Sequence, residues 1–149
     1  MSDTSIDDTA LATRAGFGAR VGRLVVGGLV ATVGTVVVTT VAAAAMEALG
    51  VDFRVEGGEV IPVSGIGFQA GVWSLVGVVI AAALLRWSGR PADRFLRTAV
   101  VLTALSLVPP VLWGSGTDTV VGLVVLHLVA AAVMVPALTR LLRRVSGPS

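Results

Sequence analysis

Several residue types that support catalysis or cofactor binding are missing or scarce in this sequence. There is no cysteine, so the chain can form neither a disulfide nor a thiolate metal site. There is no lysine, so no Schiff base can form with retinal or pyridoxal phosphate. The single histidine, His127, cannot supply a bis-histidine haem site or a multi-histidine zinc site alone. We therefore expect no cofactor and no metal.

Charge is also scarce. Only 13% of the residues are charged, whereas 55% are hydrophobic, and the mean hydropathy is +0.94. Such a composition is typical of an integral membrane protein, so the lipid bilayer is the expected partner. The basic residues are all arginines at the ends of apolar runs and form no patch with interleaved aromatic residues. Nucleic acid is therefore not expected as a partner.

Four apolar runs are long enough to cross a bilayer as helices. They lie at about 24–49, 66–87, 95–113 and 120–142. The predicted fold is an all-α membrane protein with a four-transmembrane-helix bundle, a single domain over residues 19–144. Residues 1–18 are predicted to be a mobile cytoplasmic tail and residues 145–149 a second cytoplasmic tail. A cleavable signal peptide is the alternative for the first run, but its length exceeds the roughly 7 to 15 residues of a cleavable core.

Shorter patterns predict how the runs are connected and packed. After the first run, Val51, Phe53 and Val55 alternate with charged residues before Gly57 and Gly58, which is compatible with a small extracellular β-hairpin. Against the hairpin, Pro62 cannot donate to a strand ladder. In the second run, Gly67 and Gly71 form a GxxxG pair. We expect this pair to pack against another helix of the same chain in preference to a second copy.

The arginines predict the orientation in the membrane. Ten of the eleven flank the N-terminus, the 86–97 loop and the C-terminus, whereas only Arg54 lies in a loop on the opposite side. The positive-inside rule then places both termini in the cytoplasm and the two loops that carry few arginines outside. The predicted location is the plasma membrane, with multiple passes.

Polar residues of the membrane runs gather in the outer half under this orientation. Helical spacing places Glu47 on a face with Thr40, Ala43 and Ala44, and His127 on a face with Ala130, Ala131 and Met134. Because small and weakly polar faces usually point into a bundle, we expect both ionisable groups to face inward. The hypothesis is an outward-facing cavity lined by Glu47, Gln69, Trp73, Ser106, Trp113 and His127.

In such a cavity Glu47 and His127 could act as a general acid and base. The simpler interpretation is that His127 hydrogen-bonds a neighbouring helix while Glu47 is solvated at the interface or pairs with Arg54. Trp113 likewise has the ordinary interpretation of an interfacial anchor.

The apolar runs and their flanks also resemble a known group of proteins. The matching segments are Gly-Val-Asp-Phe at 50–53, Ile-Pro-Val at 61–63, Leu-Ser-Leu-Val-Pro-Pro at 105–110, Leu-His-Leu-Val-Ala-Ala at 126–131 and Val-Pro-Ala-Leu at 135–138. With them the chain resembles small actinobacterial four-helix membrane proteins of unknown function. The resemblance implies a four-span architecture in a bacterial plasma membrane, and it implies no catalytic residue.

Three functions are compatible with these observations. The first is a non-enzymatic bundle that binds a lipid, a lipophilic small molecule or a partner membrane protein. The alternative is a membrane-embedded acid and base enzyme, such as a cyclase or isomerase of an isoprenoid-type substrate. A transporter subunit is the third.

Overall fold

The protein is a bundle of long helices. The structure is a computed structural model that describes residues 3–55, 57–114 and 116–147. The helices are α1 (Asp3–Ala48), α2 (Val63–Trp87), α3 (Pro91–Ser106), α4 (Val108–Trp113) and α5 (Thr117–Ser146). Four stretches are long and apolar enough to cross a membrane: Arg14–Ala48, Val63–Trp87, Pro91–Trp113 and Thr117–Ser146. The described residues therefore confirm a helical fold with four stretches that are long and apolar enough to span a membrane.

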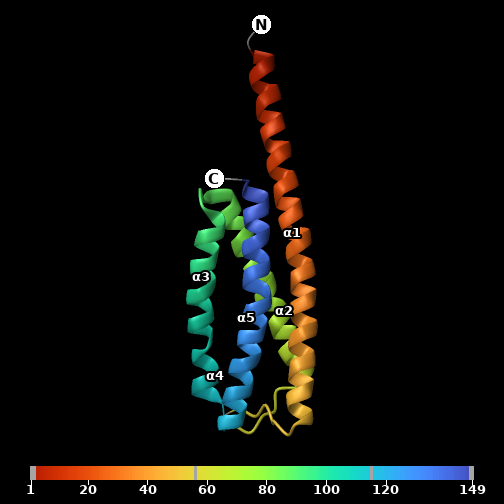
Figure 1. The fold of residues 1–149 in the computed structure, drawn as a ribbon, viewed down its shortest axis with the longest axis vertical. Coiled ribbons are helices and arrows are strands. Elements are labelled where there is room, and N and C mark those ends of the chain that lie inside the picture. Colours follow the sequence, from red (N-terminus) through yellow and green to blue (C-terminus); the bar gives the residue numbers. More distant parts are fainter. Residues whose placement is uncertain (1–2, 56, 115, 148–149) are drawn as a thin grey trace.

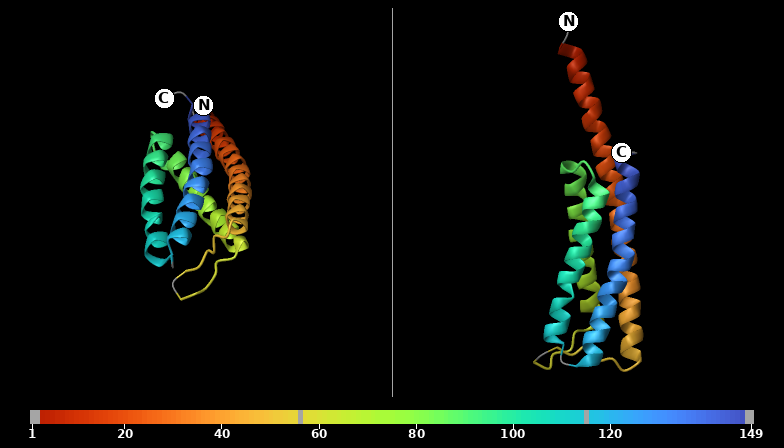
Figure 2. Two further views of the ribbon diagram at one scale, coloured as in Figure 1. Left: turned by 60° about the horizontal axis from the view of Figure 1, so that its bottom comes forward. Right: turned by 60° about the vertical axis from the view of Figure 1, so that its left-hand side comes forward.

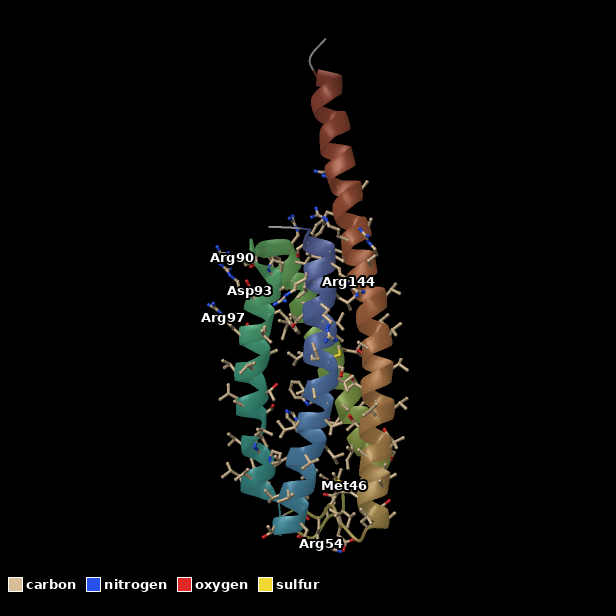
Figure 3. All side chains as sticks on the ribbon, viewed as in Figure 1. Met46, Arg54, Arg90, Asp93, Arg97 and Arg144 are labelled. Carbon is tan, nitrogen blue, oxygen red and sulfur yellow. The ribbon has the colours of Figure 1, made fainter. Side chains whose placement is uncertain are left out.

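The four segments alternate in direction, so the connections lie at two opposite ends (Figure 1). At one end lie both termini and the α2–α3 turn, and we call it the arginine end, because Arg90, Arg97 and Arg144 are found there (Figure 3). The loop end carries the α1–α2 and α4–α5 connections and Arg54. In the left-hand view of Figure 2, α3 and α1 lie on opposite flanks with α5 between them, and α1 and α3 make no direct packing contact among the described residues.

Helix α1 is the longest element and extends beyond the other helices at the arginine end (Figure 1). Its 46 residues correspond to about 69 Å, more than twice the hydrocarbon thickness of a bilayer. It begins at Asp3, so the segment up to Gly18 is helical. The centre of the Phe17 ring in this segment lies 5.3 Å from the guanidinium carbon of Arg86 in α2. That the segment is a mobile cytoplasmic tail stays a prediction.

Small residues bring α1 and α2 close together. A Cβ atom at Gly67 would collide with the Thr40 hydroxyl, and one at Gly71 would lie 3.2 Å from Val36 Cγ2. At Gly28 a Cβ atom would lie 2.8 Å from Val78 Cγ2. The GxxxG pair of α2 thus packs against α1 of the same chain, as predicted. Close packing matters in a membrane because an apolar side chain is about as stable against lipid as against another helix. The free energy of association must then come from van der Waals contacts between closely spaced helices.

The third membrane segment is broken. Helix α3 ends at Ser106 and α4 begins at Val108, with Leu107 between them. Pro109 and Pro110 have no backbone N–H, so they cannot continue the hydrogen bonding of α3 but fit the first turn of a new helix. The break therefore follows from the two prolines.

The α1–α2 connection differs from the predicted β-hairpin. The described residues contain no strand. Isolated bridges join Arg54 to Val60 and Val55 to Gly114. Gly57 and Gly58 do have positive φ, so the turn is present without a ladder. The loop instead folds onto the bundle: Phe53 is 1% exposed, and the Thr119 hydroxyl donates to the Asp52 carbonyl at 2.6 Å. The apolar residues of this segment therefore bury Phe53 against the bundle and do not form one face of a two-stranded hairpin.

Phe53 fills the loop end of the bundle. It packs in a cluster with Ala43, Ile66 and Leu126, and a Cβ atom at Gly122 would lie 3.1 Å from its ring. The loop thereby closes the end at which the sequence predicted an open cavity.

We expect Phe53→Ala to destabilise the fold by about 3–5 kcal/mol, because it leaves a large void beneath the loop. Phe68→Ala is the matched control, since Phe68 is 72% exposed on α2. Thermal unfolding of both variants in the same detergent gives the comparison. Equal midpoints for the two variants would show that the loop does not close the bundle through Phe53.

Candidate functional site

A hydrogen bond joins side chains of α3 and α5 within the membrane segments. Ser106 Oγ and His127 Nε2 lie 2.5 Å apart, and both residues are half-buried. The Ser106 hydroxyl also donates to the Thr103 carbonyl at 2.9 Å. Two of the predicted site residues, Ser106 and His127, are therefore brought together.

The fold places these side chains for simple reasons. Ser106 is the last residue of α3, next to the break before Val108, so its hydroxyl can reach back to the carbonyl three residues earlier. In α5 the buried positions nearest His127 are Gly122, Leu126 and Met134. His127 follows Leu126 by one residue, about 100° around the helix, and so it lies beside this buried stripe and reaches α3.

The position of one proton determines which histidine nitrogen donates. The Ser106 hydroxyl has a single proton and two contacts, with the Thr103 carbonyl and with His127 Nε2. When the proton is directed to the Thr103 carbonyl, the bond to His127 is donated by Nε2–H and accepted by Ser106 Oγ. In the neutral imidazole this leaves Nδ1 as an acceptor, and it has no hydrogen-bond partner among the residues that the structure describes.

Glu47 lies apart from this pair. The buried side of α1 passes through Thr32, Thr35, Thr39 and Ala43, at spacings of three or four residues. It continues to Met46, which packs on the Phe53 cluster, so Glu47 is turned about 100° away and is exposed. No described residue forms an ion pair or hydrogen bond with its carboxylate. The predicted inward orientation of Glu47 is therefore not observed.

The other predicted lining residues also point outward. Gln69 is exposed, Trp73 is 60% exposed and Trp113 is 58% exposed. That they line a cavity together with His127 stays a prediction. The exposed positions of Trp73 and Trp113 suit side chains that contact lipid or its interface.

A row of threonines inside α1 was missed by the sequence interpretation. Thr32 and Thr35 donate to the carbonyls of Gly28 and Ala31, and Thr35 also lies 3.8 Å from the sulfur of Met134. The buried hydroxyl of Thr39 has no hydrogen-bond partner among the described residues. The spacing of residues 32, 35 and 39 within an apolar helix was the signal that could have identified this buried row.

The remaining titratable groups do not form a metal site. Within residues 3–55, 57–114 and 116–147, no three histidine, aspartate or glutamate side chains gather closely enough to hold a metal ion. Among the described residues, Ser106 is the hydrogen-bond partner of His127. In the tautomer with the proton on Nε2, the imidazole can accept one hydrogen bond from a further molecule, at Nδ1.

The comparisons with known proteins concern the whole bundle. The model of DUF6069, described as a family of unknown function, matches residues 19–144. This range includes the second and third membrane segments completely, most of the first and fourth, and both Ser106 and His127. No curated protein and no solved structure matches the chain.

We expect Ser106→Ala to lower the stability by roughly 0.6–1.5 kcal/mol, because it removes a hydrogen bond between helices in the membrane. Ser64→Ala is the control, since Ser64 is exposed at the start of α2. Thermal unfolding in detergent compares the two.

A double-mutant cycle with His127→Ala separates the bond from other effects of each substitution. Additive effects of Ser106→Ala and His127→Ala would contradict a direct interaction between the two side chains.

Proposed function

The chain belongs to DUF6069, a family of unknown function, so we propose its function from its own side chains. We propose that it is a multi-pass plasma-membrane protein that binds a lipid-soluble molecule against His127. The molecule lies at the seam between α3 and α5 and presents a hydroxyl or N–H group to the imidazole. The observation that carries the proposal is the hydrogen bond between Ser106 and His127, which occupies Nε2. The proposal takes the tautomer in which Nε2–H donates to Ser106 Oγ, so that Nδ1 is the acceptor.

The surroundings of the seam support entry from the lipid. In the most apolar part of the third membrane segment only 6% of the residues are buried, compared with 17–28% in the other three segments. This segment packs against α5 and α2 and lies away from α1. A lipophilic molecule can therefore approach His127 laterally without displacing the tightly packed α1–α2 pair.

The chemistry of the seam favours binding over catalysis. An acid and base enzyme needs a second titratable group near the imidazole. The hydrogen-bond partner of His127 is instead a serine, and that serine is itself committed to a backbone carbonyl. The exposed Glu47 gives no support to the acid and base pair.

A lipid-soluble alcohol tests the acceptor directly. A photoreactive long-chain alcohol and its methyl ether differ only in the hydroxyl proton. We expect the alcohol to label the α3 and α5 peptides about fivefold more strongly than the ether, the equivalent of one hydrogen bond of about 1 kcal/mol.

In His127→Phe the preference should disappear, because the ring remains but the acceptor is lost. Thr98→Val is the control: it changes a half-buried hydroxyl of α3 and should keep the preference. Equal labelling by alcohol and ether in the unmodified protein would refute the proposed function, and a partner membrane protein would then be the better candidate.

The proposed orientation places the arginine end in the cytoplasm. It is supported by the ten arginines on that side and the single Arg54 at the loop end. Because the chain has no cysteine, one introduced thiol reports on one site. In intact cells a membrane-impermeant maleimide should label Glu59→Cys, whereas Ala15→Cys should be labelled only after permeabilisation. The reverse pattern would contradict this orientation.

A further inference from the structure

The arginine end has a basic hollow on the outer side of α3. Its volume is about 480 Å³, and it is lined by Gly89, Arg90, Asp93, Arg94 and Arg97. Arg97, in α3, and Arg90, just before its first residue, project away from the other helices (Figure 3). Three arginines and one aspartate give this lining a net charge of +2. We propose that the hollow binds the phosphate of an anionic phospholipid.

The arginines of the hollow are available to an anion. The carboxylate of Asp93 lies 4.0 Å from a guanidinium nitrogen of Arg143, in α5, and so it is already shared with another cation. Among the described residues no acidic side chain lies within 4 Å of the guanidinium groups of Arg90, Arg94 or Arg97. Guanidinium groups bind phosphate oxygens with paired, charge-assisted hydrogen bonds, so an anionic group would complete this cluster.

The backbone beneath the hollow is held in place. Pro91, Ala92 and Phe95 are buried and fix the first turns of α3 against the bundle. The Arg90 N–H donates to the Ser88 hydroxyl at 3.2 Å, which fixes the turn before α3. The arginines therefore extend from a rigid base, which lowers the entropy cost of binding an anion.

The same face of α3 continues as an apolar surface toward the bilayer centre. From Arg94 and Arg97, steps of three or four residues lead to Val101 and Leu105, which are 57% and 61% exposed. One face thus presents charge first and then exposed apolar side chains, in the order of the head group and acyl chain of a phospholipid. A soluble phosphate would use only the charged part, so the apolar continuation favours the lipid as the source of the anion.

Anionic lipid is also the chemistry expected at this depth. Clusters of arginine next to membrane segments attract acidic head groups, and basic pockets at helix ends bind them individually. The exposed Trp87, at the end of α2 next to the hollow, suits the interface where head groups lie. This site is distinct from the seam at His127, which lies toward the opposite end of α3.

Native mass spectrometry of the full chain in detergent tests the site with equal concentrations of phosphatidylglycerol and phosphatidylcholine. We expect preferential retention of phosphatidylglycerol by the unmodified protein. The triple variant Arg90→Gln, Arg94→Gln, Arg97→Gln should lose about tenfold or more of this preference, because each arginine contributes to the attraction.

The matched control is Arg14→Gln, Arg23→Gln, Arg140→Gln, which removes the same charge from exposed arginines outside the hollow. The control should keep the preference. An equal loss in both triple variants would overturn the proposal, since the attraction would then depend on total charge alone.

Two further measurements keep the result interpretable. Circular dichroism should show unchanged helix content in both triple variants, because all six side chains are exposed, and Arg94→Gln alone should still weaken retention if the triple variant misfolds. Soluble glycerol phosphate at the lipid's concentration should not displace phosphatidylglycerol. Displacement by glycerol phosphate would overturn the assignment to lipid and identify a soluble anion as the ligand.

Discussion

The close contact between α1 and α2 is the constraint on which the bundle depends. A membrane helix gains little from hiding apolar side chains, so association depends on how near two backbones can come. Gly28 in α1 and Gly67 in α2 each leave room for a side chain of the opposite helix. The buried threonines of α1 follow the same side, and α5 packs there as well. With these three helices fixed, the segment formed by α3 and α4 is left as the least buried of the four membrane segments.

This division places the two proposed sites on the same peripheral helix. At the loop end, the prolines after Ser106 interrupt the helix and leave a hydroxyl next to His127. At the arginine end, the first turns of α3 carry the basic hollow. A helix surrounded on all sides could present neither group to lipid. The loose packing of α3 is therefore the common physical basis of both proposals, although their chemistry differs.

Much of this fold could be predicted because hydropathy and proline report directly on membrane helices. The sequence also singled out His127 and Ser106, since polar groups at membrane depth need partners. The sequence did not predict the orientation of Glu47. The buried side of α1 continues from Ala43 to Met46, three residues later, whereas the prediction assumed a four-residue step to Glu47. The prediction failed at Phe53 because an alternating pattern suits a hairpin and a loop packed inward equally well. Which way these side chains point depends on which helices lie next to each other, and hydropathy carries no information on that arrangement.

The hydrogen bond between Ser106 and His127 has a consequence for the timing of any exchange with the bilayer. A bond between helices contributes about 1 kcal/mol, so its loss changes the population of the bonded state only about fivefold. Thermal fluctuations are then sufficient to break and remake this bond, while Phe95 in the core cluster and the Asp93–Arg143 ion pair still hold α3 against the bundle at the arginine end. A molecule in the surrounding lipid would therefore meet an imidazole whose bond to the serine exchanges without any input of chemical energy, and its residence time would be set by its own fit to the imidazole.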